Sequence, residues 1–126
     1  MYVSVNVNPI KKMTGDCVIR AMALLTDLTW EQAYMELCKE GLLQADLPNA
    51  NSVWGAFLKK RGFKRESIPN TCPDCYTVED FAYDHPTGRY AVCTGTHVVA
   101  IMDGGNYFDA WDSGREIPSF YFYKED

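Results

Sequence analysis

The spacing of the apolar residues changes near residue 85, and this change constrains the fold more than any other feature of the sequence. Before residue 85, four segments are predicted to be helices: 18–25, 30–40, 51–61 and 77–85. Their apolar residues have helical spacing, or, in 18–25, occupy nearly every position. After residue 85 come short runs typical of strands, over 89–94, 97–102, 106–112 and 116–123. A short strand or extended arm is also expected over 2–7. Helices first and an antiparallel meander last predict an α+β fold, with the N-terminal helices packed on one face of a C-terminal antiparallel sheet.

Capping signals indicate where the chain enters and leaves its helices. Thr29 and Gln32 have the spacing of a capping box at the start of the second helix. Gly41 is the expected stop of that helix. Thr14 or Asp16 is placed to cap the first helix.

Length and charge narrow the class of protein. With 126 residues, no linker and no internal repeat, the chain is expected to form a single domain, 1–126. A net charge of −5 argues against nucleic-acid binding, which normally requires a basic surface to neutralise phosphates. No run approaches the roughly 18 apolar residues of a membrane span. With no secretory signal visible either, we expect a cytoplasmic protein that does not contact a membrane.

The five cysteines are irregularly spaced, and we do not expect a disulfide framework. Cys72 and Cys75 form a C-x-x-C, a spacing that occurs in zinc sites and in redox pairs. A structural zinc usually needs four ligands, and the sequence offers no second close pair. We therefore expect an incidental loop here, with zinc or redox roles as alternatives, and we predict no metal and no cofactor.

Cys17 is the residue best placed for chemistry. It stands in the predicted first turn of a buried helix, where unpaired backbone N–H groups and the helix dipole favour a negative charge. Both effects stabilise the thiolate, which is the nucleophilic form of cysteine. Because free cysteine is often buried, a plain core residue is the alternative interpretation.

His97 is the candidate base. It is one of only two histidines and opens the apolar run 98–102. A histidine at a strand end can reach the start of a helix that packs on the sheet. Imidazole is also the usual base that activates a cysteine nucleophile. A structural histidine is the alternative.

A third group is expected to orient the imidazole, and the register of the hairpin selects it. If Gly104 and Gly105 form a two-residue turn, His97 faces Asp112 across the two strands. Asp109 then points to the other face of the sheet, although a one-residue change of register reverses this choice. We predict Asp112 as the orienting carboxylate and keep Asp109 as the alternative.

The order of these residues resembles that of papain-like cysteine hydrolases. In those enzymes a Cys opens a long helix, a His opens a strand far downstream, and an Asn or Asp follows on the next strand. More closely, several segments resemble a family of small proteins from bacteriophages and bacterial mobile elements: 14–21, 77–81, 85–88, 97–104 and 109–114. The resemblance implies a papain-like fold in the bacterial host cell, with Cys17, His97 and Asp112 as catalytic residues.

One position departs from the papain-like pattern. Papain-like enzymes usually carry a Gln six residues before the cysteine, which donates to the oxyanion, and here that position is Lys11. Asn8 on the extended arm, or backbone N–H groups at Cys17, are the candidates to replace it. Asp16 is a further supporting candidate, although helix capping is its simpler role.

Three functions are compatible with these observations. The first is a cysteine hydrolase or acyltransferase that acts on a peptide or amide bond of a peptide or protein substrate through a thioester. The second is an inactive binding module on the same fold, such as a phage-encoded inhibitor of a host protein. The third is a metal-stabilised adaptor that uses Cys72 and Cys75.

Overall fold

The computed structural model describes residues 1–125, which form four helices and a six-stranded mixed sheet. The helices are α1 (Cys17–Thr26), α2 (Trp30–Gln44), α3 (Asn51–Lys59) and α4 (Val78–Asp84). The strands are β1 (Tyr2–Ser4), β2 (Lys64–Ser67), β3 (Arg89–Cys93), β4 (Val98–Met102), β5 (Asn106–Asp109) and β6 (Phe120–Lys124). The predicted α+β class is confirmed. None of the helices in this part of the chain is long and apolar enough to cross a membrane.

The sheet has the strand order β1-β5-β4-β3-β6-β2 and is not purely antiparallel. Strands β3, β4 and β5 form the expected antiparallel meander, and β6 adds to β3. At one edge, however, β1 pairs with β5 in parallel, with Tyr2 opposite Tyr107. The predicted antiparallel sheet is therefore confirmed for the C-terminal strands, whereas the sheet as a whole is mixed. Most of the chain separates β1 from β5, so no tight hairpin forces the two strands to run in opposite directions.

Strand β2 forms the other edge of the sheet and was not expected from the sequence. All its residues are exposed, and Arg65 lies opposite Phe122 of β6. The segment carries no alternating apolar pattern because neither of its faces is buried. Charged side chains on an edge strand also oppose pairing with a further chain.

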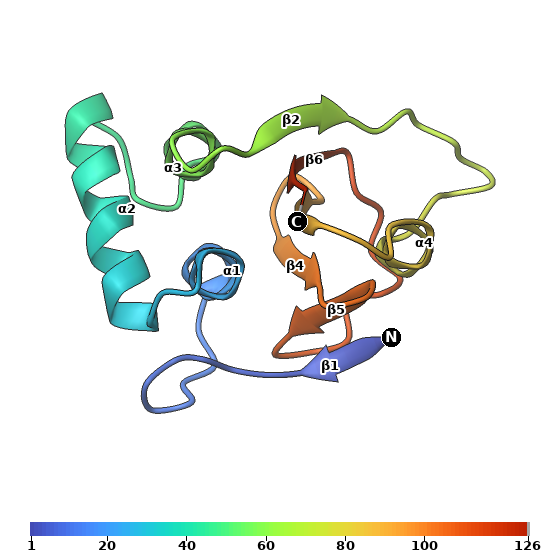
Figure 1. Cartoon of the computed structure of the whole chain (residues 1–126), viewed down its shortest axis with the longest axis horizontal. Coiled ribbons are helices and arrows are strands. Elements are labelled where there is room, and N and C mark those ends of the chain that lie inside the picture. Colours follow the sequence, from blue (N-terminus) through green and yellow to red (C-terminus); the bar gives the residue numbers. More distant parts are fainter. Residues whose placement is uncertain (126) are drawn as a thin grey trace.

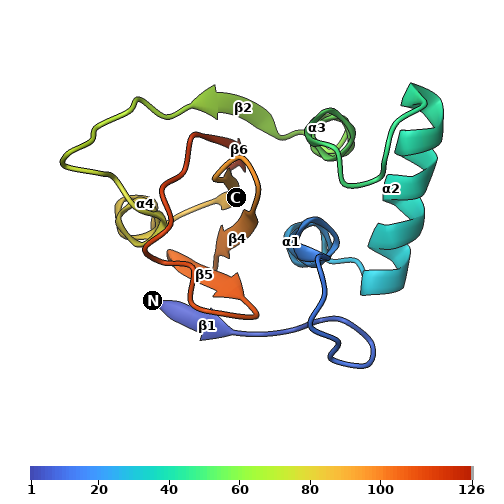
Figure 2. The same cartoon turned by 180° about the vertical axis from the view of Figure 1, so that it is seen from behind.

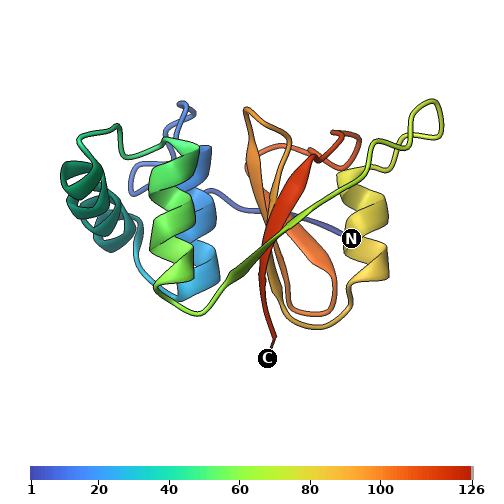
Figure 3. The same cartoon turned by 90° about the horizontal axis from the view of Figure 1, so that it is seen from above.

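The helices lie on both faces of the sheet (Figure 1). Figure 3 shows α1, α2 and α3 on one side and α4 on the other, and the view from behind agrees (Figure 2). Helix α1 packs on β3 and β4, whereas α2 packs on α1 and α3. The prediction that all helices cover one face is wrong. The reason is that every residue of β4 is buried, so both faces of the central strand require cover.

Two clusters of buried side chains fill the space on the two faces. The cluster on the α1 side takes Val98, Ala100 and Met102 from β4. The cluster on the α4 side takes Val99 and Ile101. This alternation is the period of two expected of a strand, and it explains why the run 98–102 has no polar residue.

Helix α2 extends to Gln44, so Gly41 is not its stop. A Cβ built at Gly41 would lie 2.8 Å from the carbonyl oxygen of Asp46. The glycine therefore allows the chain after the helix to pass close to its last turn. The capping box of Thr29 and Gln32, at the start of α2, is confirmed.

Removal of side-chain volume at β4 is expected to destabilise the protein. Ile101 is 0% exposed, whereas Ile117 is 50% exposed and provides a matched control. We expect Ile101→Ala to lower the free energy of unfolding by about 2–5 kcal/mol, because a cavity remains in the core. Ile117→Ala should change it by about 0.5 kcal/mol or less. Urea unfolding measures both values, and similar losses in the two variants would contradict this assignment of the core.

Candidate active site

Helix α1 begins at Cys17, and the preceding residue occupies the cap position. The side chain of Asp16 makes no capping hydrogen bond, although its backbone carbonyl accepts from the N–H of Arg20 at 3.0 Å. The prediction that the side chain of Thr14 or Asp16 caps this helix is wrong. The Asp16 carboxylate is instead directed into a buried network described below. The first turn of α1 therefore lacks a side-chain partner for its N–H groups.

Cys17 and His97 line the same cavity, which has a volume of about 520 Å³. The start of α1 and the turn between β3 and β4 lie at the same end of the molecule (Figure 3), and residues of both line the cavity. Its other lining residues include small and polar residues from the loops and from the start of α3, together with one large aromatic side chain: Thr14, Gly15, Asn49, Asn51, Gly95, Thr96 and Trp111. The structure thus brings together the two residues that the sequence predicted as nucleophile and base.

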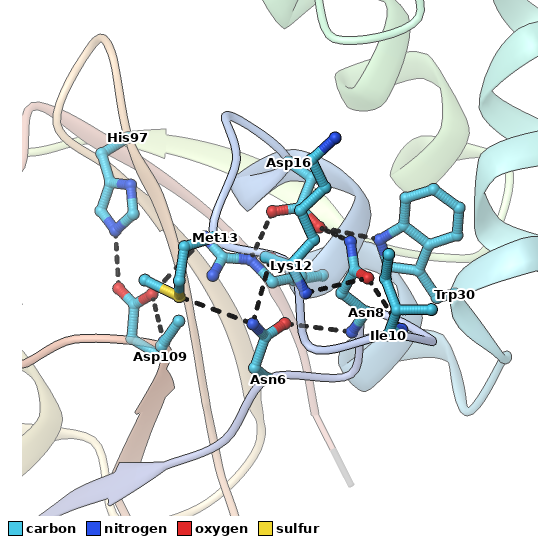
Figure 4. A network of polar contacts seen from close by, with 11 residues as sticks. Asn6, Asn8, Ile10, Lys12, Met13, Asp16, Trp30, His97 and Asp109 are labelled. Carbon is cyan, nitrogen blue, oxygen red and sulfur yellow. Dashed lines mark hydrogen bonds and ion pairs between the residues drawn. The ribbon is translucent and has the colours of Figure 1, made fainter.

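Asp109 holds the imidazole of His97 (Figure 4). The distance from His97 Nε2 to Asp109 Oδ2 is 2.6 Å, and the carboxylate is buried. Ser113 Oγ donates to the same carboxylate oxygen at 2.7 Å, and the N–H of Ala110 donates to Asp109 Oδ1 at 2.8 Å. These contacts fix the orientation of the carboxylate and of the ring.

The prediction that Asp112 faces His97 is wrong, because the hairpin has a three-residue loop. Met102 pairs with Asn106, which leaves residues 103–105 in the loop. Relative to a two-residue turn, the register moves by one residue. Because side chains alternate between the two faces of a strand, a shift by one residue turns Asp112 away from the face of His97 and brings Asp109 onto it.

Asp112 has a different set of partners. Its Oδ1 accepts from the hydroxyl of Tyr107 at 2.8 Å and from the N–H of Gly114 at 3.0 Å. Asp112 thereby organises the loop that follows β5, and it makes no contact with the imidazole.

The surroundings of His97 favour its protonated form. Burial lowers the pKa of the imidazole, but the hydrogen bonds to Asp109 and Cys17 outweigh burial and raise the pKa to about 9. Because Nε2 is bonded to Asp109, Nδ1 is the nitrogen available to Cys17. Trp111 covers one face of the ring, with the two ring centroids 4.8 Å apart.

The surroundings of Cys17 favour the thiolate. Burial raises the pKa of the thiol, but several opposing effects outweigh burial and the pKa is lowered. These effects are hydrogen bonds from His97 and the backbone N–H of Val98, and the positive charges of His97 and Arg20. A thiolate beside an imidazolium is the reactive form of a nucleophilic cysteine.

Asn8 does not reach the cavity, so its predicted role as oxyanion donor is not supported. Its Nδ2 donates to Asp16 Oδ2 at 3.1 Å, and its Oδ1 accepts from the N–H groups of Ile10 and Lys12 at 3.1 and 3.2 Å (Figure 4). The amide is thus committed to shaping the loop before α1. Lys11 points elsewhere as well, because its Nζ donates to the carbonyl of Asn6 at 2.8 Å.

The Asp16 carboxylate is buried and links the loop to α2. Besides the Asn8 amide, it accepts from Trp30 Nε1 at 2.9 Å (Figure 4). Two neutral donors therefore meet one of its oxygens, and the other oxygen faces Arg20. Asp16 supports the site from behind and does not line the cavity.

Arg20 is a residue of the site that sequence reasoning missed. Its Nε lies 3.1 Å from Asp16 Oδ1 as an ion pair that lacks the alignment of a hydrogen bond. Its Nη2 lies 3.9 Å from Asp109 Oδ1. The signal was present, because Arg20 is the one charged residue in the run 17–26 and stands four residues after Asp16. Ser113 and Trp111 were missed too, and no local pattern marks them.

Cys72 and Cys75 lie in the loop between β2 and α4 and do not line the cavity. They form a disulfide with an S–S distance of 2.02 Å, which corrects the expectation of an incidental loop. Within residues 1–125, no group of three or more His, Cys, Asp or Glu side chains is arranged to hold a metal ion.

The arrangement offers a nucleophile, a base that is also an acid, and an orienting carboxylate at one cavity. Such a set is suited to acyl transfer through a covalent intermediate. No protein-family model, curated protein or solved structure matches the chain. What the site does is therefore inferred from its geometry.

The pKa of His97 distinguishes Asp109 from Asp112 as the carboxylate that orients the imidazole. We expect Asp109→Asn to lower that pKa from about 9 toward the ordinary value of 6.5, because the imidazolium loses its negative partner. A decrease of about 1–3 is typical of a lost close charge. Asp112→Asn should leave the pKa unchanged. NMR titration of the imidazole protons measures both, and a fall in the Asp112 variant alone would reverse the assignment.

Proposed function

We propose that this protein is a cysteine hydrolase or acyltransferase with a papain-like arrangement of Cys17, His97 and Asp109. The observation that carries the proposal is the position of His97. Its Nε2 is 2.6 Å from a buried carboxylate, while its other side bonds to a thiol at the start of a helix. This order of nucleophile, imidazole and carboxylate is the one that activates a nucleophile for acyl transfer.

In the first half-reaction, the Cys17 thiolate attacks the carbonyl carbon of a peptide or amide bond. The carbonyl π electrons move to oxygen and give a tetrahedral oxyanion. When that intermediate collapses, the C–N bond breaks, and His97 gives its proton to the departing nitrogen. The products are a free amine and a thioester between the acyl group and Cys17.

In the second half-reaction, neutral His97 takes a proton from water, and the resulting hydroxide attacks the thioester. Collapse of this second intermediate breaks the C–S bond, releases a carboxylic acid and restores the thiolate beside the imidazolium. An amine in place of water gives transfer of the acyl group instead of hydrolysis. Asp109 keeps the ring in position and stabilises its charged form throughout.

Backbone groups are the best candidates to stabilise the oxyanion. The N–H groups in the first turn of α1 have no side-chain cap, and the helix dipole favours negative charge there. Asn51 also lines the cavity. Its Oδ1 accepts from Trp54 Nε1 at 2.9 Å, which leaves its Nδ2 as a donor for a bound substrate. These groups replace the Gln that the papain-like pattern carries at the position of Lys11.

A binding module is the second candidate, favoured by exposed apolar side chains beside the site. Ile10 and Met13, on the loop that precedes Cys17, are 79% and 67% exposed. Side chains of this kind fit contact with another protein, such as a host protein bound by a phage-encoded inhibitor in the cytoplasm. In that case the effect on the partner survives Cys17→Ala, whereas a hydrolase loses its activity.

Alkylation tests the ion pair without a substrate. We expect iodoacetamide to modify Cys17 at pH values below the ordinary thiol pKa of 9.0, because its surroundings lower the pKa of this thiol. In His97→Ala, alkylation of Cys17 at neutral pH should slow about tenfold for each pH unit by which the thiol pKa rises. Cys38, a half-buried free cysteine on α2, is the internal control. Site-resolved mass spectrometry follows each cysteine, and identical rates for Cys17 in both proteins would reject the thiolate–imidazolium pair.

The reaction itself can be tested with an activated ester and an anilide. With p-nitrophenyl acetate, we expect a burst of p-nitrophenol and an acetyl group on Cys17, absent in Cys17→Ala and retained in Asp112→Asn. For an anilide, the rate should fall above about pH 9, because His97 then lacks the proton needed by the leaving nitrogen. Stopped-flow absorbance and intact-mass analysis report the burst. A burst that persists in Cys17→Ala would assign the chemistry to another residue.

A further inference from the structure

Two charged residues next to the triad are buried without being part of it. Arg20 is 7% exposed and Asp16 is 5% exposed. Burial of a charge is costly unless an opposite charge compensates it. Both residues belong to the start of α1, which is otherwise apolar over its buried positions. The cost of burying Arg20 and Asp16 therefore indicates that the two charges have a role in the protein.

The position of the Arg20 guanidinium points to that role. It lies between two carboxylates, with Nε 3.1 Å from Asp16 Oδ1 and Nη2 3.9 Å from Asp109 Oδ1. Arg20 also lines the cavity, together with Cys17 and His97. Its Nε makes no aligned hydrogen bond, so the guanidinium meets Asp16 and Asp109 as ion pairs, and burial restricts its movement. It therefore acts as a fixed positive charge beside the triad.

We infer that Arg20 is a positioning residue of the site, whose buried charge compensates Asp109 and sets how strongly Cys17 and His97 hold their protons. The role of Arg20 in catalysis rests on the proposed function. Its effect on the proton affinities of Cys17 and His97 can be measured without a substrate.

Charges of alternating sign run from the back of the site to its front. The order is Asp16, Arg20, Asp109, His97 and Cys17, and consecutive members are in contact. In the free protein, the positive charge of Arg20 stabilises the thiolate. In the acyl-enzyme, the thiolate charge is gone and His97 must be neutral to accept a proton from water. Without Arg20, the buried carboxylates would then hold the proton on His97 and slow the second half-reaction.

The other charged groups near the site do not supply this effect. Cys93 on β3 is buried beside Cys17, and burial raises the pKa of its thiol, so it remains neutral at physiological pH. Lys11 on the preceding loop points to the carbonyl of Asn6. Arg20 is therefore the cation, besides His97 itself, that acts on the Cys17 thiol.

The direction in which the pKa values of Cys17 and His97 change on loss of Arg20 distinguishes this role from a structural one. Loss of a nearby positive charge makes each remaining proton harder to remove. We therefore expect Arg20→Met to raise the pKa of both Cys17 and His97, each by about one pH unit. Loosening of the site would instead admit water and move the His97 pKa down from about 9 toward 6.5.

The experiment compares Arg20→Met with Arg20→Lys and Arg61→Met. The pH dependence of iodoacetamide alkylation gives the Cys17 pKa, and NMR titration gives the His97 pKa. Arg20→Lys should restore values close to wild type, because it keeps the charge. Arg61→Met removes the same charge from an arginine that pairs with Glu36 on α2, and it should change neither value. Unchanged values in Arg20→Met, or a fall for His97, would overturn the inference.

A second variant keeps the test decisive if near-UV circular dichroism shows that Arg20→Met fails to fold. Asp16→Asn retains Arg20 and removes the negative charge beside it, so both pKa values should fall. A rise or no change in this variant also overturns the inference. Failure of the proposed function is a separate result, since the pKa values can shift as expected in a protein that turns over neither ester nor anilide.

Discussion

The central strand β4 is buried on both of its faces, and the rest of the structure follows from the need to cover them. Helix α1 packs over β3 and β4 on one side, and α4 lies on the other. The apolar residues of α1 bind it to the sheet, and its first turn then meets the start of β4. Cys17 is the first residue of α1, and His97 immediately precedes β4. The packing of two apolar surfaces thus brings nucleophile and base to one cavity.

The charged residues of the site depend on one another. Asp16, Arg20, His97 and Asp109 are each buried, and an isolated ion in such a position costs several kcal/mol. Alternation of sign lets each charge offset the next. Removal of one member leaves its neighbour uncompensated, so effects of single substitutions at these positions will not be additive. The same low dielectric that makes these charges costly strengthens the bond between His97 and Asp109.

The loop after β5 completes the site. Ser113 donates to the carboxylate of Asp109, and Trp111 covers a face of His97. Asp112, between them, bonds to Tyr107 and the backbone of Gly114. Residues 111–113 therefore shield the contact between imidazole and carboxylate, and the hydrogen bonds of Asp112 stabilise the loop that carries them. Shielding from water favours a stable orientation of the ring in both half-reactions.

The sequence by itself determined the four helices, every strand except β2 and the chemistry at their ends, because these are local properties. The apolar run 18–25 placed Cys17 in the first turn of α1, the capping box of Thr29 and Gln32 started α2, and the apolar run 98–102 placed His97 at a strand end. The tertiary structure decided which groups meet. The segment Asp103-Gly104-Gly105-Asn106 is compatible with loops of two or three residues, and the loop of three residues formed here selected Asp109 over Asp112. Long-range packing likewise set the parallel pairing of β1, the position of α4 and the placement of Arg20 between two carboxylates, since no local pattern encodes contacts between residues far apart in the chain.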